Sequence, residues 1–327
     1  IYLYSLIVPI ISVSGIFLSY FNQQKRYKLL ISNGINPVKA ANIIFNIPEV
    51  TKPNLLIIIG SIFFVIFTLL VGTSKMALSQ EIVFVGSFMI ILFLLFKLSN
   101  ELDANAKKML IGTAIIIFVF RAMPGVGQGG SWFEIDVLGF DQEFLSLLGL
   151  IASFLTILGI FVLRPLMEKS SMTRLIVILS IAGSFFILPS IAMFYGFHEF
   201  TSKLTNGLVD ARFIAIFNTA LESPLGQVSM IPILAWIAQS APNHLKATFF
   251  AVLASFTNLA LSASNLGTKY LNQIYVITRE VKNDLGIIKT PADYSELGIL
   301  LIIVCALTLI IPILVTYIVK KLKLLSY

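Results

Sequence analysis

Long apolar stretches recur along the chain, and each is about as long as a lipid bilayer is thick. The runs at 175–196 and 301–320 are typical, because neither contains a charged residue before its last position. A hydrocarbon core of about 30 Å needs roughly 20 helical residues to cross it. The pattern predicts nine membrane-spanning helices, at about 1–20, 55–72, 82–98, 109–135, 144–163, 175–197, 209–239, 246–271 and 297–319.

The apolar runs are continuous, which favours helices over a β-barrel, whose strands alternate between apolar and polar residues. Charged residues make up only 12% of the chain and hydrophobic residues 57%, whereas soluble domains carry about 25% charged residues. The sequence therefore predicts an all-α integral membrane protein with the lipid bilayer as its surroundings. The chain begins inside an apolar run, at Ile1, and we expect it to be truncated at the N-terminus.

Basic residues gather on one side of the predicted membrane. One set of alternate loops carries 14 lysines and arginines and the other set carries 5. Since cytoplasmic loops are enriched in basic residues, we expect the first set, and the C-terminus, to be cytoplasmic. We therefore interpret the net charge of +7 as basic loops at the membrane surface and not as a surface that binds nucleic acid.

Arg121 lies deep in the fourth predicted span, 109–135, and is followed by a segment rich in helix breakers. Pro124 and four glycines between Gly125 and Gly130 predict a broken helix, which is tolerated at membrane depth where it lines a cavity or packs on protein. An ionisable group in a span is a candidate functional residue. Arg121, with Gln128 and Trp132 of the same region, is therefore a candidate for substrate binding; the alternative for Arg121 is a structural ion pair.

The seventh predicted span, 209–239, carries a second group of polar residues. Asn218, Glu222 and Ser229 fall on one face of a regular helix, Pro224 opens the helix after Glu222, and Gln227 follows. A buried carboxyl group can carry a proton through a transport cycle. Glu222 is predicted either to do this or to pair with Arg121 or another buried cation.

The eighth predicted span shows a polar stripe. Five residues recur at steps of three and four and therefore share one helical face: Ser255, Asn258, Ser262, Asn265 and Lys269. Such a face either lines water or packs against another helix. The two asparagines and the lysine favour a cavity, and Asn258 and Asn265 join the candidate substrate-binding residues.

Motifs for other chemistry are missing or lack their structural context. The glycines at 125, 127 and 130 match a dinucleotide fingerprint, but they follow an apolar helical run where that motif requires a strand. A single cysteine, Cys305, and two histidines in predicted loops make a metal site improbable. We expect no enzyme activity, no cofactor, no metal and no nucleic acid partner.

Several short motifs between 210 and 267 resemble the folate–biopterin transporter family, a branch of the major facilitator superfamily. They include Asp210-x-Arg-Phe213, Met230-x-Pro232, Ala241-Pro242, Lys246-Ala-Thr-Phe-Phe-Ala251 and Asn265-Leu-Gly267. The resemblance covers about 109–320. Asn218 departs from an expected aspartate and Lys246 from an expected glutamate.

The resemblance implies a secondary transporter with a cavity between two six-helix bundles. Arg121, Glu222, Gln227 and Asn258 would face that cavity. The implied organisation is 1–20 as the last helix of an incomplete N-terminal bundle, 21–54 as a cytoplasmic linker, 55–98 as an additional helix pair, 109–320 as the C-terminal bundle and 321–327 as a cytoplasmic tail.

Two functions remain open at this point. The first is a secondary active transporter in a bacterial inner membrane that moves folate, biopterin or another small organic solute by alternating access, with or without coupling to protons. The second is a non-transporting fragment or helical membrane scaffold. A transporter for a different organic anion is a variant of the first.

Overall fold

The computed structural model describes residues 7–45, 55–74, 76, 78–226, 228–240, 246–283 and 288–324. The chain divides into two compact units, residues 1–54 and residues 55–327. In the first unit, α2 (Ile7–Ser32) and α3 (Pro37–Phe45) are joined by a turn in which Gly34 has φ 84°. Helix α2 continues well beyond the predicted end of its span at residue 20. Pro37 starts α3, since proline fits the first turn of a helix, so the predicted linker 21–54 is partly helical.

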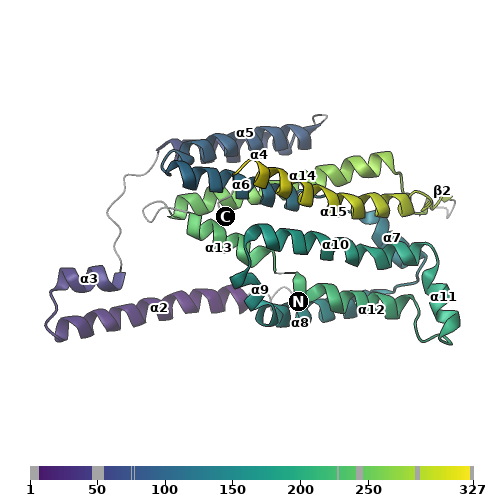
Figure 1. The fold of residues 1–327 in the computed structure, drawn as a ribbon, viewed down its shortest axis with the longest axis horizontal. Helices are drawn as coiled ribbons and strands as arrows, with labels where there is room; N and C mark the ends of the chain where they lie inside the picture. The colour runs from purple at the N-terminus through teal and green to yellow at the C-terminus, as the bar shows by residue number, and fades with distance from the viewer. Residues whose placement is uncertain are drawn as a thin grey trace. The chain divides into compact units, whose positions relative to one another are not determined.

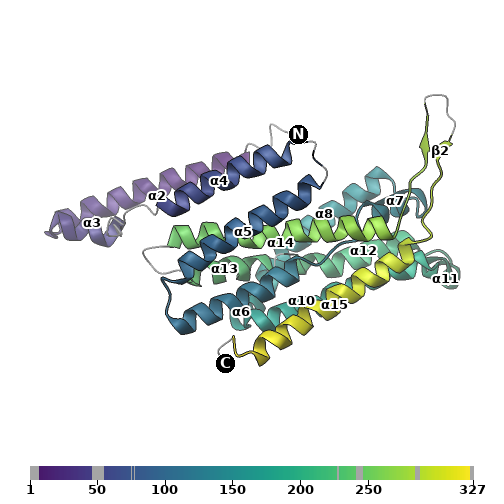
Figure 2. The same cartoon turned by 90° about the horizontal axis from the view of Figure 1, so that it is seen from above.

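The second unit is built from helices with one short β-hairpin (Figures 1 and 2). Its elements in chain order are α4 (Leu55–Gly72), α5 (Ser79–Ser99), α6 (Ala104–Arg121), α7 (Gln128–Asp136), α8 (Gln142–Val162), α9 (Arg164–Lys169), α10 (Met172–Phe194), α11 (Phe197–Leu204), α12 (Ala211–Glu222), the 3₁₀ turn η1 (Ser223–Leu225), α13 (Met230–Ser240), α14 (Lys246–Ile274), β1 (Val281–Lys282), β2 (Ile288–Thr290) and α15 (Leu297–Lys321).

Five of the described helices are long and apolar enough to cross a bilayer: α5, α8, α10, α14 and α15. A shorter apolar helix runs from Ile58 to Gly72 within α4. The protein is thus a multi-pass, helical membrane protein. Two predicted spans, 109–135 and 209–239, are not continuous helices, and the number of nine spans stays a prediction.

Both interruptions follow from the local sequence. Helix α6 ends at Arg121, and α7 resumes at Gln128, so the predicted break is confirmed for residues 122–127 while Gly129 and Gly130 are helical. In the other span, η1 follows directly after Glu222 and contains Pro224, because proline lacks the N–H that a continuing helix needs. Ser229 lies beyond this turn, so the prediction that it shares a helical face with Asn218 and Glu222 is wrong.

The core of the second unit joins helices that are distant in sequence. Ile117 of α6, Ile237 of α13, and Phe249 and Leu253 of α14 are fully buried in one cluster. Helices α10 and α15 lie side by side (Figures 1 and 2), and the Ser184 hydroxyl donates a hydrogen bond across them to the Cys305 carbonyl at 3.2 Å. This packing fixes α14 against α6 and α13 on one face and leaves its polar stripe on another.

The segment between α14 and α15 contains an antiparallel hairpin of β1 and β2. It is tied to α7, because Arg279 donates to both oxygens of Asp136 at 2.7 and 2.8 Å, and the Tyr294 hydroxyl donates to Asp136 at 2.7 Å. The bonds from Arg279 and Tyr294 lower the pKa of Asp136. Burial, followed by the bond to Asp136, raises the pKa of Tyr294 to about 12.

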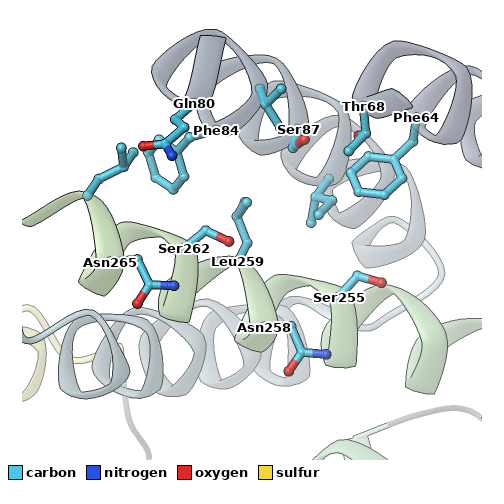
Figure 3. Close-up of a pocket in the computed structure, with 13 residues that line it drawn as sticks. Phe64, Thr68, Gln80, Phe84, Ser87, Ser255, Asn258, Leu259, Ser262 and Asn265 are labelled. Atoms are coloured by element: carbon cyan, nitrogen blue, oxygen red, sulfur yellow. The ribbon is translucent and has the colours of Figure 1, made fainter. Parts of the chain in front are cut away.

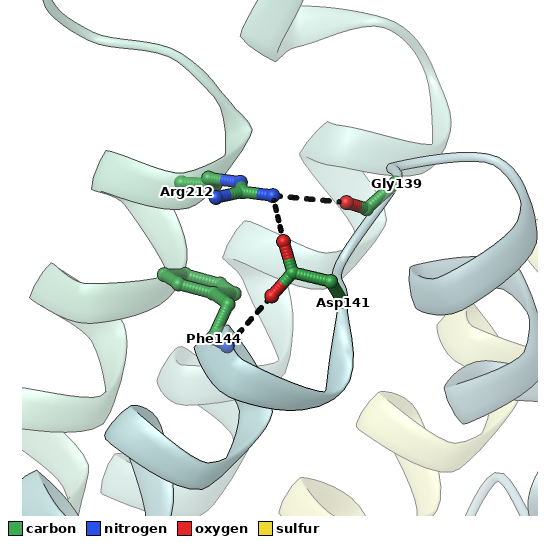
Figure 4. Close-up of polar contacts among 4 residues, drawn as sticks. All are labelled: Gly139, Asp141, Phe144 and Arg212. Atoms are coloured by element: carbon green, nitrogen blue, oxygen red, sulfur yellow. Dashed lines mark hydrogen bonds and ion pairs between the residues drawn. The ribbon is translucent and has the colours of Figure 1, made fainter.

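Asp141 caps the N-terminus of α8 and connects it to α12 (Figure 4). Its carboxylate accepts a 2.8 Å bond from the Phe144 N–H and a 2.7 Å bond from Arg212, which also donates to the Gly139 carbonyl and lies over the Phe144 ring. These bonds, first the backbone one, lower the pKa of Asp141. Its contribution to stability is therefore present above the ordinary aspartate pKa and is lost as the pH falls through the lowered value.

We expect Asp141→Ala to lower the melting temperature of the purified protein more than Asp141→Asn does. An asparagine oxygen can still accept the Phe144 N–H as a helix cap, whereas alanine loses the cap and the contact with Arg212 together. Thermal unfolding of both variants in detergent at neutral pH measures the difference. Equal melting temperatures for the two variants would show that the cap contributes nothing.

A candidate solute site along helix α14

The polar stripe of α14 faces a cavity (Figure 3). Ser255, Asn258, Ser262 and Asn265 line one wall of a space of about 520 Å³. The opposite wall comes from α4 and α5 and holds Phe64, Thr68, Gln80, Phe84 and Ser87. We name this space the α5–α14 cavity. Its two walls combine amide and hydroxyl groups with aromatic rings.

Most polar groups of this cavity are available to a ligand. Among the described residues, the side chains of Asn258, Ser262 and Asn265 make no hydrogen bond. The Thr68 hydroxyl is buried and has no partner in the described part of the chain. A buried polar group without a partner is costly, so a solute that bonds these groups would be stabilised there.

A second space, the α7–α14 cavity, continues from the first. It has a volume of about 580 Å³ and shares Gln80 and Asn265 with the α5–α14 cavity. Gln128 and Trp132 of α7 and Lys269 of α14 also line it. The structure therefore brings four predicted site residues to connected cavities: Gln128, Trp132, Asn258 and Asn265.

A third cavity, of about 420 Å³, extends the series in the other direction. It lies between α14, from Ala247 to Ser255, and the helices α4 and α5, and it shares Phe64 and Ser255 with the α5–α14 cavity. Connected spaces thus follow α14 from its first turn to beyond its last residue. At 1.5 Å per residue, this helix is about 43 Å long, which exceeds the bilayer core.

An ion pair crosses between α5 and α14 beside these cavities. The Lys269 ammonium donates to Glu81 Oε1 at 2.6 Å, and the Tyr270 hydroxyl donates to the same oxygen at 2.9 Å. The side chains are 34% exposed for Lys269 and 17% exposed for Glu81. The second oxygen, Oε2 of Glu81, is buried without a partner among the described residues.

A different face of α14 holds the broken segment 122–127. Three side chains on successive turns of α14 bond three of its backbone groups: Thr268 accepts from the Gly125 N–H at 2.9 Å, Ser264 donates to the Met123 carbonyl at 2.6 Å, and Asn272 donates to the Val126 carbonyl at 3.1 Å. Unpaired backbone groups are excluded from a bilayer core, so α14 makes this break possible.

Gly127 is required at the end of that segment. Its φ of 79° lies in the left-handed region that favours glycine. A Cβ at this position would also stand 2.8 Å from the Asn272 amide. The glycine therefore allows Asn272 to approach closely enough for its bond to the broken backbone.

Arg121 lies apart from these cavities. It is the last residue of α6, its Nη1 donates to the Met230 sulfur at 3.2 Å, and its Nε is buried without a partner in the described part of the chain. Within the described residues no ion pair joins Arg121 to Glu222. The predicted pairing of these two residues is therefore not found.

Glu222 and Asn218 face two further spaces. Glu222 lines a cavity of about 410 Å³ with Thr156 and Thr219, between α8 and the end of α12 with η1. Asn218 lines a separate, mostly apolar cavity of about 330 Å³ and donates to the Phe186 carbonyl at 3.3 Å. The eight predicted site residues therefore do not form one site, and Gln227 lies outside the described residues.

Sequence reasoning missed the residues that complete the site from α4 and α5. Gln80 and Glu81 stand at the start of an apolar run and look like ordinary residues at the end of a span. The signal that could have found Glu81 is the lysine at position 269, since a cation on a membrane helix needs a partner.

Comparison with known proteins places these helices in a family. Residues 95–326 match the BT1 family, so the match includes α6 to α15 and leaves out α4 and most of α5. A protein described as a folate-biopterin transporter from Synechocystis sp. is 21% identical over 154 residues, which are 47% of this chain and 30% of that relative. The match thus spans less than a third of the relative, and no solved structure matches the chain. Since the family match covers well over half of the sequence, the predicted resemblance is confirmed and the chain belongs to the BT1 family.

Proposed function

We propose that this protein is a secondary active transporter that moves folate, biopterin or a related small organic solute by alternating access. Membership of the BT1 family and the likeness to a folate-biopterin transporter support a transporter role. The observation that carries the proposal further is the series of connected cavities along α14. A transported solute needs polar contacts at several depths of the membrane, and this helix offers them along its length.

The chemistry of the cavity walls suits a flat, polar solute. Gln80, Asn258 and Asn265 offer both donors and acceptors, which can bond the edges of a polar ring. Phe64 and Phe84 of the same cavity, and Trp132 of the next, offer faces on which such a ring can stack. Folate and biopterin both contain a ring system of this kind.

The proposal includes coupling to protons through Glu222. This carboxyl group faces its own cavity beside Thr219 and forms no ion pair with another described residue. A carboxyl group without a permanent cation can bind and release a proton during a cycle. The proposed location is a bacterial inner membrane, within a major facilitator-type bundle.

Uptake of labelled folate and biopterin at two external pH values tests this function. We expect saturable uptake that is higher at acid pH, and about a tenfold or larger loss of that uptake in Glu222→Gln. Glu143→Gln, at the exposed start of α8, serves as the control. Each variant is compared at equal abundance in the membrane.

The other outcomes separate the alternatives. Saturable uptake that does not depend on pH would reject proton coupling but keep transport. Uptake of neither compound, with the protein confirmed in the membrane, would favour a transporter for a different organic anion or a non-transporting helical scaffold. Normal uptake in Glu222→Gln would reject the proposed role of Glu222.

A further inference from the structure

We propose that Lys269 is the anion-binding group of the solute site and that Glu81 occupies it when no solute is bound. A carboxylate of the solute would replace Glu81 at the Lys269 ammonium and thereby break the ion pair that joins α5 to α14. This inference rests on the proposed transport function. It adds a binding group and a link between binding and movement.

The position of Lys269 is the first argument. Of the described residues that line the α5–α14 and α7–α14 cavities, only Lys269 is charged. It lies one helical turn from Asn265, which lines both spaces. A solute that bonds Asn265 through its polar ring would therefore bring an attached anionic group within reach of the Lys269 ammonium.

The second argument is that the ion pair leaves bonding capacity unused on both sides. An ammonium carries three donors, and a single hydrogen bond from Lys269, to Glu81, is found among the described residues. Glu81 receives Lys269 and Tyr270 on the same oxygen, while its Oε2 is buried and unpartnered. The pair thus makes fewer hydrogen bonds than a carboxylate and an ammonium can form. A solute carboxylate can therefore compete with Glu81 for Lys269.

The third argument is where Glu81 stands. It belongs to α5, across the cavity from α14, so the bond from Lys269 joins the two walls directly. A solute carboxylate can shift a conformational equilibrium only through a difference in its affinity for the two states. Here that difference arises because Lys269 offers its full charge to a solute carboxylate only when Glu81 has left it.

Binding of two probes to the purified protein in lipid nanodiscs tests the inference. Folate carries carboxylates and biopterin does not, although both contain the polar ring. We expect Lys269→Gln to weaken folate binding about tenfold, as the loss of one charge-assisted bond predicts, and to leave biopterin binding within about twofold. Glu81→Gln is expected to strengthen folate binding several-fold, because it removes the competing carboxylate, and to leave biopterin binding unchanged.

Two further variants guard against a general loss of structure. Lys269→Arg keeps the cation and should retain most of the folate affinity. Glu280→Gln breaks the exposed ion pair with Lys282 in the hairpin and should leave the binding of both probes unchanged.

The outcomes are distinguishable. Two results would show that the pair is only a structural contact: equal weakening of folate and biopterin binding in Lys269→Gln, or weaker folate binding in Glu81→Gln. Either result overturns the inference and leaves the proposed transport function standing. If the unmodified protein binds biopterin but not folate, the site accepts no carboxylate and the inference is again overturned. If it binds neither probe, the proposed substrates fail, and this inference fails with them.

Discussion

Replacing Gly159 with alanine is expected to destabilise the protein by about 3 kcal/mol, in the upper range for overpacking of a well-packed core. Gly159 is a buried residue of α8, and a Cβ there would stand 2.2 Å from the Pro224 carbonyl oxygen and 2.5 Å from its Cα. The obstacle is backbone, not the end of a flexible side chain, so α8 and η1 must separate. Unfolding of the purified protein in detergent, followed by tryptophan fluorescence, measures the loss.

Gly149 of the same helix provides the matched control. Nothing lies within 4 Å of a Cβ built at that position, and alanine is a better helix former than glycine by about 1 kcal/mol. Gly149→Ala should therefore leave stability unchanged or raise it. An equal loss in both variants would mean that the close contact between Gly159 and Pro224 does not limit the packing.

Replacing Ser262 with tryptophan is expected to abolish solute uptake. Ser262 lies in the middle of the polar stripe and lines the α5–α14 cavity of about 520 Å³ (Figure 3). An indole ring at this position projects into the space between α14 and the wall formed by α4 and α5 and narrows it. We expect uptake of the best labelled substrate to fall by at least about tenfold, which corresponds to 1.4 kcal/mol or more.

A tryptophan at the neighbouring residue Leu261 is the control that distinguishes a blocked cavity from a damaged helix. Leu261 is 45% exposed and is not among the residues that line the α5–α14 cavity, so a larger side chain there has room outside the cavity. Leu261→Trp should therefore retain uptake at equal membrane abundance. Normal uptake in Ser262→Trp would show that the solute does not pass through the α5–α14 cavity.

The parts of the site that the sequence predicts best are those carried by one continuous helix. Ser255, Asn258, Ser262 and Asn265 recur at helical spacing, and α14 is unbroken over this stretch, so the period alone places them on one cavity wall. The break before α7 is predictable for a similar reason, because Pro124 and the glycines act locally on the backbone.

The parts that could not be predicted depend on contacts between distant segments. The approach of α5 to α14 that pairs Glu81 with Lys269 spans nearly two hundred residues of sequence, and no periodicity encodes it. Periodicity also fails across a turn. Asn218, Glu222 and Ser229 share a face only in an uninterrupted helix, and the 3₁₀ turn η1 interrupts the helix between Glu222 and Ser229.

The three bonds from α14 to residues 122–127 have a mechanical consequence. Ser264, Thr268 and Asn272 hold the interruption between α6 and α7 along two turns of α14, so a rotation or slide of α14 alone would strand these backbone groups in the bilayer core. The interruption and α14 must therefore travel as one rigid body. The sliding surface of the proposed transport cycle is then the opposite side of α14, which is joined to α5 by the bonds of Lys269 and Tyr270 to Glu81 and otherwise by non-directional apolar packing.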